Sequence, residues 1–577
     1  MRAKASKDGL TLRVIAGTNN VLLAMDLSEA KRPNCLGFSI ERTDLETGDR
    51  RWLTNMKRFR ADPNEKLVTS ARAPLQKFRW GDYTIEPGKR YRYRVVARFG
   101  SAADILKEGI SAEKPGSFDV IDGGVTVEVR AENSREDITA VFFNRGAAAS
   151  EAYFRRFGNN DPATIPDALV WLSRGLQEAI LAFLAKAIDE TYELHAAIYE
   201  FQKPELLQGL VQAKERGVDV KVVYHARDKG ADDTTRSANE KAIADAGITF
   251  AKPRQADPQS AIMHDKFVVL LRKDGAGTAQ PIGVWTGSTN WTDGGIYGQL
   301  NVGHAVYDPD VAAKYESCFD LLSQDLSEAA SHKALAKLTP VPPNRDAIEH
   351  GVTPIFSPQS DLAMIDLYAE ICSKAKVLMV CAPFELHAKI RAALETVAPG
   401  TVRFLMADKE GSYGSKGNGE IDMIEGDPQN KAVVATVLKN PLNDFQGRLL
   451  EHTESFHHAG VHIHSKIIAA DPFGIDPILV TGSANFSNNS TKVNDSNSLI
   501  IRGDTAVTDI YVTEFMRMFE HYWFRFKRAQ VEADAAKTGK KLDDVLALSD
   551  DASWSDPFYV AGSKEMLDRQ AFAGLTL

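Results

Sequence analysis

The sequence predicts a multidomain protein, with an N-terminal all-β sandwich followed by two α/β lobes. Three observations lead to this fold class. The chain has 577 residues, too many for one hydrophobic core. Near Ile138 its pattern changes from short alternating strands to strands that alternate with helices. Two short motifs that begin at His264 and His464 then recur in the same order, which indicates an internal duplication.

The composition is that of an ordinary acidic globular protein. The net charge is −9, which counts mildly against a large polyanionic partner, although a groove lined by lysines could still be locally positive. No stretch has the apolar length of a membrane helix, and the basic start Met1–Asp8 lacks the apolar core of a signal peptide. Cysteines stand singly, without CxxC spacing, which argues against disulfide or zinc frameworks. We therefore expect a cytoplasmic protein.

Residues 1–128 predict the β-sandwich. Apolar and polar residues alternate in Gly9–Val14, Gly37–Arg42 and Tyr91–Arg98, and turn signals separate these runs. The run Trp80–Ala97, in which Pro87-Gly88 precedes alternating aromatic and apolar residues, resembles the later half of a fibronectin type III domain. No titratable cluster is present. We expect a packing module or a docking surface for a protein partner, with the arginine side of Tyr91–Arg98 as the more interesting face.

Residues 137–337 and 345–530 predict the two lobes. Both show the order strand, helix, strand, helix, strand, which favours a mostly parallel sheet. The first lobe has strands at 139–143, 193–199 and 218–222 and helices at 175–187 and from Pro204 to Gly217. The second has strands at 352–356, 377–381 and 402–405 and helices at 361–373 and 386–397. Residues 338–344 are a stiff Pro-rich linker, and 531–577 form a C-terminal extension.

The duplicated motifs carry the candidate site residues. Each motif places a His and a Lys two apart at the start of an apolar run, so both side chains project from one face of a strand. A second apolar run then leads to a Gly-Ser-x-Asn turn. The first copy contains His264, Lys266, Ser288 and Asn290, and the second contains His464, Lys466, Ser483 and Asn485.

These residues resemble the phospholipase D superfamily, whose repeated signature is His-x-Lys, four residues, Asp, then Gly-Ser-x-Asn. The second copy matches in full and includes Asp471. The first copy has Leu271 at the Asp position, and its nearest acid is Asp274. The resemblance implies that the two lobes are related by a pseudo-twofold axis and that the two histidines meet across it.

The resemblance also implies a mechanism. One imidazole attacks phosphorus to form a phosphohistidine, while the other protonates the leaving oxygen and then activates water. Family precedent assigns His264 as nucleophile and His464 as acid/base, with the lysines and asparagines stabilising phosphoryl charge. No metal and no other cofactor is expected. An acid usually orients each ring, and the comparable places here hold Asn301 and, as a substitute, Asp495.

Four further residues beside the motifs have two readings each. Ser288 and Ser483 lie outside a Gly-x-Ser-x-Gly pattern, so they are better read as turn-forming or phosphate-contacting residues than as nucleophiles. Trp291 and Phe486 directly follow the asparagines and either wall the pocket or pack in the core.

Three segments around the second motif complete the prediction. Loops at 411–419 and 451–458 have no counterpart in the first lobe and are candidates for substrate selection. His452, His457 and His458 could bind a metal, but a polar loop with incidental histidines is the simpler reading. A helix from Ile510 to about Ala535 should pack against the core through an apolar side that contains Phe515, Met518, Phe519, Tyr522 and Phe526.

Three functions fit these residues. We favour a metal-independent phosphodiesterase that cleaves nucleic acid, DNA or RNA, in the cytoplasm. A phospholipase D-type hydrolase or transphosphatidylase acting on phospholipids is the alternative, and a non-catalytic phosphate-binding relic is the third. One chain supplies both halves of the site, so catalysis does not require an oligomer, and the sequence leaves the oligomeric state open.

Overall fold

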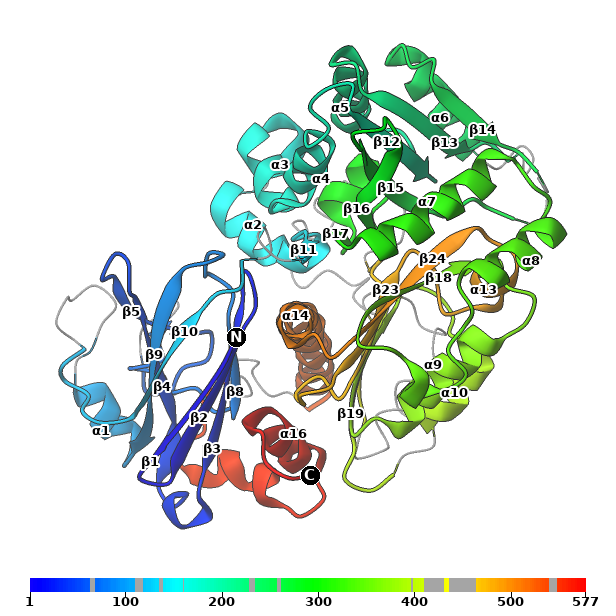
Figure 1. Ribbon diagram of the computed structural model, residues 1–577. Coiled ribbons are helices and arrows are strands. Elements are labelled where there is room, and N and C mark those ends of the chain that lie inside the picture. Colours follow the sequence, from blue (N-terminus) through cyan, green and yellow to red (C-terminus); the bar gives the residue numbers. More distant parts are fainter. Residues whose placement is uncertain are drawn as a thin grey trace.

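The computed structural model describes residues 1–62, 68–108, 110, 118–133, 138–158, 160–227, 234–256, 261–395, 398–408, 430–434, 463–538 and 547–577. The two loops predicted at 411–419 and 451–458, with His452, His457 and His458, lie outside these residues. Figure 1 shows N-terminal sheets on one side of a long helix and two α/β lobes on the other.

The N-terminal region contains two four-stranded antiparallel sheets that enclose an apolar core. One sheet has the order β1 (Arg2–Lys7), β2 (Leu10–Ala16), β3 (Val21–Leu27), β8 (Arg79–Asp82). The other has the order β10 (Val125–Arg130), β9 (Arg90–Phe99), β4 (Cys35–Asp44), β5 (Arg50–Trp52). Strands β6 (Thr54–Asn55) and β7 (Val68–Thr69) pair separately, and α1 spans Ala102–Lys107. The three predicted strands lie in β2, β4 and β9. The finer resemblance to fibronectin type III remains a prediction.

Three arginines of β9 are engaged within the N-terminal region. Arg92 pairs with Glu128, Arg94 with Glu41, and Arg98 with Glu108. Since these ion pairs link β9 to its neighbours and to the residue after α1, this face is less available to a partner than the sequence indicated.

Two seven-stranded sheets form the α/β lobes and have equivalent strand orders. The first sheet has the order β11 (Thr139–Phe143), β17 (Val302–Val306), β16 (Ala279–Gly287), β15 (Lys266–Lys273), β12 (Tyr192–Ile198), β13 (Asp219–His225), β14 (Ala251–Arg254). The second has the order β18 (Gly351–Ser357), β24 (Ser496–Arg502), β23 (Ile478–Gly482), β22 (Ile467–Ala470), β19 (Val377–Ala382), β20 (Val402–Ala407), β21 (Asn430–Val434). The predicted strands match these elements, except that 193–199 runs one residue past the end of β12 and 218–222 starts one residue before β13.

The prediction of mostly parallel sheets is wrong. Only β12, β13 and β14 in the first sheet, and β19, β20 and β21 in the second, pair in parallel; the other neighbours are antiparallel. The connection from β15 to β16 is the short segment 274–278, and a parallel crossover would need a dozen residues or more. The change from parallel to antiparallel pairing occurs at β12 and β19, and the motif strands β15 and β22 are their antiparallel neighbours.

Helices cover the sheets and join the lobes. Those of the first lobe are α2 (Ser150–Phe157), α3 (Pro166–Ser173), α4 (Leu176–Leu184), α5 (Pro204–Glu215), α6 (Thr235–Asp245), α7 (Pro309–Ser323) and α8 (Glu328–Leu338). Those of the second are α9 (Ala363–Lys374), α10 (Ala388–Glu395) and α13 (Asn488–Lys492). Helix α7 contacts strands of both sheets, and one continuous apolar core includes residues of both lobes.

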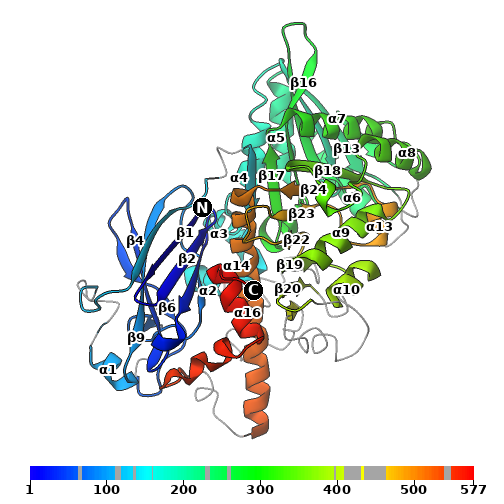
Figure 2. The ribbon, with the colours of Figure 1, turned by 60° about the horizontal axis from the view of Figure 1, so that its bottom comes forward.

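Helix α14 (Thr505–Thr538) lies between the N-terminal sheets and the lobes (Figure 1). Phe515, Met518, Phe519 and Tyr522 are buried, as predicted. Residue 531, the expected start of the extension, lies inside this helix. The chain then returns to the N-terminal sheets, where the helical segment Ala552–Tyr559 and helix α16 (Lys564–Ala573) pack (Figure 2).

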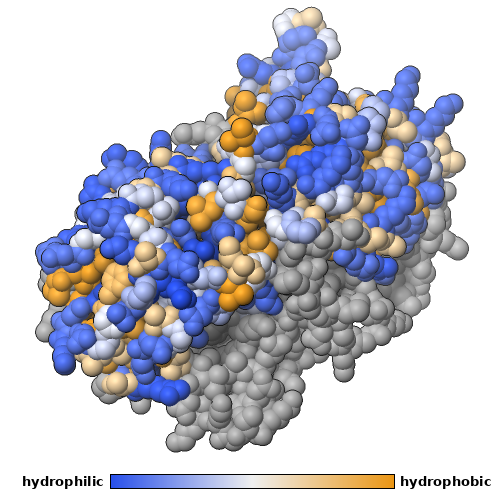
Figure 3. All heavy atoms as spheres, turned by 90° about the horizontal axis from the view of Figure 1, so that it is seen from below, coloured by the Kyte–Doolittle hydropathy of each residue, from blue (hydrophilic) through white to orange (hydrophobic). Residues whose placement is uncertain are grey.

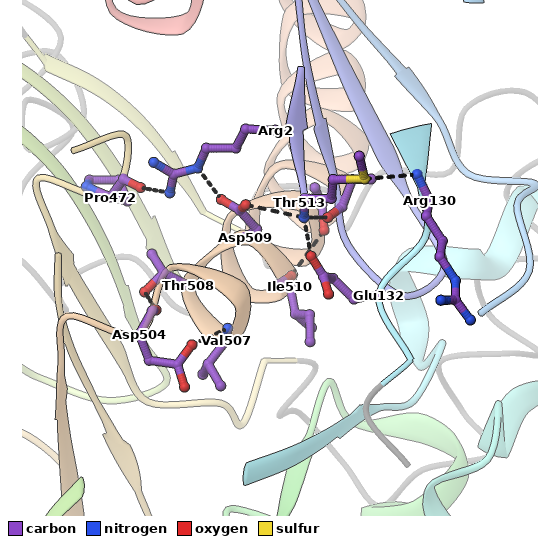
Figure 4. A network of polar contacts seen from close by, with 12 residues as sticks. Arg2, Arg130, Glu132, Pro472, Asp504, Val507, Thr508, Asp509, Ile510 and Thr513 are labelled. Atoms are coloured by element: carbon purple, nitrogen blue, oxygen red, sulfur yellow. Dashed lines mark hydrogen bonds and ion pairs between the residues drawn. The ribbon is translucent and has the colours of Figure 1, made fainter. Parts of the chain in front are cut away.

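Arg2 ties three parts of the chain together (Figure 4). Its Nε donates to Asp509 Oδ1 of α14 at 2.8 Å, and its Nη2 donates to the carbonyl of Pro472 at 2.7 Å. The first strand, the central helix and the turn after β22 are thus held by one guanidinium.

No helix among the described residues combines the length and the apolar character needed to span a bilayer. On the face drawn in Figure 3, apolar atoms form small patches among hydrophilic ones.

Candidate active site

The motif segments of the two lobes pair with each other's sheets. The N–H of His264 donates to the carbonyl of Asp495 at 2.7 Å, and the N–H of His464 donates to the carbonyl of Leu300 at 3.1 Å. Asp495 and Leu300 each stand just before a strand of the opposite lobe, β24 and β17. These contacts bring the starts of β15 and β22 together.

The two predicted histidines therefore face each other. Their ring centroids are 6.3 Å apart at an interplanar angle of 74°, and each residue is 5% exposed. Lys266 and Lys466 are buried beside them, and each ammonium donates to the carbonyl of its own histidine, at 2.7 and 2.6 Å. Two histidines and two lysines thus converge from both lobes.

The electrostatics of this cluster favour uncharged imidazoles. Burial, followed by the charges of both lysines, lowers the pKa of His264 and of His464 well below the ordinary value. Burial lowers the pKa of Lys266 to about 7, and burial together with Lys266 lowers the pKa of Lys466 well below its usual range. All four shifts disfavour the positively charged form of these side chains. An anion that enters the site would stabilise that form, so its binding should be accompanied by uptake of protons by the histidines and lysines.

Among the side chains that the structure describes, one holds His464 and none holds His264. Nδ1 of His464 lies 2.9 Å from Asn301 Oδ1 and 3.0 Å from the carbonyl of Ser288, so Nδ1 carries the proton and Nε2 is left for chemistry. The carbonyl of Ser483 favours the charged form of His264, but among the described residues Nδ1 of His264 has no hydrogen bond of ordinary geometry.

Asn301 in the first lobe corresponds to Ser496 in the second. The N–H of Ser288 donates to Val302, which follows Asn301, and the N–H of Ser483 donates to Asn497, which follows Ser496. The hydroxyl of Ser496 lies 3.5 Å from the carbonyls of Ser490 and Asn494, and so it is directed to the backbone and not to the imidazole of His264. The two halves therefore differ in how the imidazole is oriented.

Asp495, the suggested orienting acid for His264, does not contact the ring. Arginines bind its carboxylate, and its backbone groups bind the segment that carries His264. Its carboxylate pairs with Arg227 Nη2 at 3.0 Å and with Arg254 Nε at 3.3 Å. Its N–H donates to the carbonyl of Ile262 at 3.0 Å, and its carbonyl accepts from His264. Asp495 thereby fixes the segment that carries His264 but does not hold its ring.

The Gly-Ser-x-Asn turns have the same construction in both lobes. Ser288 and Ser483 accept hydrogen bonds from the backbone N–H groups of Val302 and Asn497, at 3.1 and 3.0 Å, so both serines shape the turn. A side chain at Gly287 would meet the carbonyl of Val302 at 2.3 Å.

The asparagines of the two turns each carry a buried side-chain amide oxygen. Asn290 and Asn485 each have a buried Oδ1 without a hydrogen-bond partner among the described residues. An amide oxygen only accepts, so a contact with a phosphoryl oxygen would have to come from Nδ2 of these side chains.

Asp471 lies away from the histidines, at the far end of β22. Its Oδ1 accepts from the N–H groups of Lys376 and Val377 at 2.7 and 3.1 Å, and its Oδ2 pairs with Arg345 at 2.7 Å. Its counterpart Leu271 is buried within β15 and packs in the core. The change at this signature position therefore leaves the convergence of the histidines intact.

Tyr199 was missed from the sequence. Its ring centroid is 5.1 Å from that of His264, and Nζ of Lys266 lies 5.0 Å from the centroid of the same ring. Tyr199 directly follows β12, and side chains at the carboxyl ends of parallel strands collect at one edge of a sheet, which was the available signal. Trp291 and Phe486, in contrast, are core residues that pack on Phe201 and Tyr368.

Comparison with known proteins supports the phospholipase D superfamily for the first motif region. Residues 184–322 match the family described as "Cardiolipin synthase, PLD-like domain". None of the curated proteins matches the chain.

Several solved structures are similar over parts of the chain. Nuc from Salmonella typhimurium, a phospholipase D family member, is 24% identical over 26% of this chain and 87% of its own, with a TM-score of 0.21. Phosphatidylserine synthase from Haemophilus influenzae is 11% identical over 61% of this chain and 85% of its own, with a TM-score of 0.41. Polyphosphate kinase from Porphyromonas gingivalis is 12% identical over 61% of this chain, with a TM-score of 0.39, and the match spans 48% of the kinase.

Proposed function

We propose that the protein is a metal-independent phosphodiesterase whose two lobes, related by a pseudo-twofold axis, share one active site. The observation that carries the proposal is the convergence of two buried His-Lys pairs, with the rings 6.3 Å apart. A phosphate between the rings would present opposite sides of one phosphorus atom to them. In this proposal the first lobe comprises residues 137–337 and the second comprises residues 345–530.

The first step forms a covalent intermediate. Nε2 of His264 attacks phosphorus, the bond from phosphorus to the leaving oxygen breaks, and His464 gives that oxygen its Nε2 proton. The pKa of both rings is low, so His264 is uncharged and able to attack, and His464 gains its Nε2 proton when the anionic phosphate enters the site. The hydrogen bond from Nδ1 of His464 to Asn301 supports the role of His464 as acid, because it aims Nε2 at the substrate.

The second step returns the enzyme to its starting state. His464 takes a proton from water, the water oxygen bonds to phosphorus, and the bond from phosphorus to His264 breaks. Lys266, Lys466, Asn290 and Asn485 offset the charge on the phosphoryl oxygens in both steps. With these cations in place, the chemistry needs no metal.

We further propose nucleic acid, DNA or RNA, as the substrate, in keeping with the predicted cytoplasmic location. The alternative is a phospholipid, and the description of the matching family as cardiolipin synthase favours it as the second candidate. The preserved geometry of both half-sites speaks against a non-catalytic relic. The N-terminal sheets are a candidate surface for a protein partner.

The test is to incubate the purified chain, in chelator, with DNA, RNA and mixed phospholipid vesicles. Products from DNA or RNA, lost in His264→Ala, support the proposal. Products from vesicles alone would replace the nuclease with a phospholipase. Failure to cleave any of the three would favour the relic.

A further inference from the structure

A second cluster of titratable side chains lies at the end of the first sheet opposite the candidate active site. Glu193 and His195 are two apart on β12 and project from one face, and Asp219, the first residue of β13, is paired in register with Glu193. One nitrogen or oxygen of each of the three lies within 4.8 Å of the others. Helix α7 packs against this face and adds Glu316.

The hydrogen bonds of His195 leave one ring nitrogen exposed to negative charge. Nδ1 lies 2.7 Å from Glu316 Oε1, and because a carboxylate only accepts, Nδ1 carries the proton. Nε2 has no hydrogen-bond partner among the described residues, although the residue is only 4% exposed, and it stands 3.3 Å from Glu193 Oε2. A lone pair and a carboxylate at this distance repel unless a second proton on the ring or a metal cation lies between them.

The ring cannot easily turn away from this position. It stacks on Phe319 with the centroids 4.8 Å apart and the planes at 17°. Together with the hydrogen bond to Glu316, the stacking fixes Nε2 toward Glu193 and Asp219.

We propose that Glu193, His195 and Asp219 bind a zinc ion. Imidazole nitrogen and carboxylate oxygens are ordinary zinc ligands, with water as the fourth. A histidine that binds a metal usually donates its other N–H to a carboxylate, which is the arrangement of Glu316 and His195. Asp219, whose side chain is 42% exposed, opens the site to solvent.

Lysines around this cluster compete with the metal. Lys221 Nζ lies 3.3 Å from Asp219 Oδ2 and 3.7 Å from Glu193 Oε2, and Lys273 Nζ lies 3.9 Å from Glu193 Oε1. Lys221 is half exposed, so it can swing into solvent when zinc enters. Removing it should tighten zinc binding, which is opposite to the effect of removing a ligand.

The zinc ion would stabilise the fold of the first lobe and would not take part in the reaction. Ile198, at the other end of β12, pairs with Lys266, and it is three positions after His195, which corresponds to roughly 10 Å of strand. The ion would join β12 and β13 to one another and, through Glu316, to α7. This inference is independent of the phosphodiesterase proposal.

The experiment measures zinc binding to the metal-stripped full chain by equilibrium dialysis, together with thermal unfolding. His452, His457 and His458 are first changed to Gln, so that they contribute no zinc binding. We expect this parent to bind zinc with a raised Tm, and His195→Gln to lose at least tenfold in affinity. Glu193→Gln should also weaken binding, Glu316→Gln should weaken it less, and Lys221→Ala should strengthen it.

His332→Gln is the matched control. His332 Nε2 also faces a glutamate, Glu328 at 3.7 Å, but it is occupied by the carbonyl of Lys492 at 2.7 Å. The proposal is overturned if the parent binds no zinc, or if His195→Gln and Glu193→Gln, each with the circular dichroism of the parent, bind it as the parent does. Cobalt gives a second readout: visible bands typical of tetrahedral Co²⁺ should appear in the parent and be absent in His195→Gln.

Discussion

The two half-sites contain the same kinds of residue but support them differently. In both, a lysine donates to the carbonyl of its histidine, and in both an asparagine follows a tight serine turn. Only His464 is held by a side-chain amide, that of Asn301. The comparison indicates that the duplication retained the convergence of the reactive groups while the contacts behind them diverged.

The middle residue of each His-x-Lys shows the same divergence. Ser465 donates to the carbonyl of Leu300 at 2.9 Å. Asp265 instead accepts from Asn497 Nδ2 at 2.6 Å, and burial raises the pKa of its carboxyl to about 7. Both residues point away from the histidines and attach their lobe to the opposite one, but with different chemistry.

Removing either ring should have the largest effect. His264→Ala and His464→Ala should each lower kcat on the order of 10⁴-fold, because the first removes the proposed nucleophile and the second removes the proposed acid. Steady-state rates on the substrate identified in chelator measure this. Near-normal turnover in either variant would mean that the halves do not share one reaction.

Removing the residue that orients the imidazole should affect activity in one half-site and not at the matching position of the other. Asn301→Ala should lower kcat about 10- to 100-fold, since His464 keeps its chemistry but loses its orientation. Ser496→Ala, at the matching place, should change kcat less than about twofold and serves as the control. Asn301→Asp should restore the acceptor and, through its charge, raise the pKa of His464, which moves the alkaline limb of the kcat profile upward. Equal losses in the alanine variants would contradict the asymmetry.

Loss of positive charge from the site should set the alkaline limb of the pH profile, and Lys266 contributes to it together with His464 and Lys466. In the proposed mechanism the ammonium of Lys266 stabilises the phosphoryl oxygens, and its pKa of about 7 means that this charge is lost as pH rises. We expect kcat/KM to fall roughly tenfold per pH unit above about 7. The acidic limb lies well below pH 6.5, where His264 becomes protonated. A profile that stays flat to pH 9 would show that this lysine is not required in its charged form.

The signature position that differs between the halves should matter least to activity. Asp471→Leu copies the first half into the second and removes the acceptor of two backbone N–H groups and of Arg345. We expect a loss of about 1–3 kcal/mol in the free energy of unfolding, measured in urea, with kcat unchanged. A large loss of kcat at unchanged stability would place Asp471 in the reaction.

The sequence predicted the strands and the pairs of site residues because both depend on local spacing. The spacing of two residues where the chain enters β15 sets His264 and Lys266 on one side, and the tight turn at Gly287 needs a residue without a side chain. The antiparallel pairing in each sheet was missed because strand direction depends on which segments close together in space.

Contacts between distant segments were also beyond prediction from the sequence. No spacing reveals that Arg227 and Arg254 meet Asp495, that the segment after α14 returns to the N-terminal sheets, or that Glu316 lies behind His195. Each depends on the packing of elements far apart in the chain. Asn301 could be identified as an orienting residue only through a resemblance, since an amide alone carries no such signal.

The most direct test of the shared site is to trap the covalent intermediate. Substrate labelled at phosphorus is mixed with the protein and quenched, and the labelled residue is identified by peptide mass spectrometry. The account predicts acid-labile, base-stable phosphate on His264, present in His464→Ala and absent in His264→Ala. Phosphate on a serine, or no protein-bound phosphate during turnover, would contradict it.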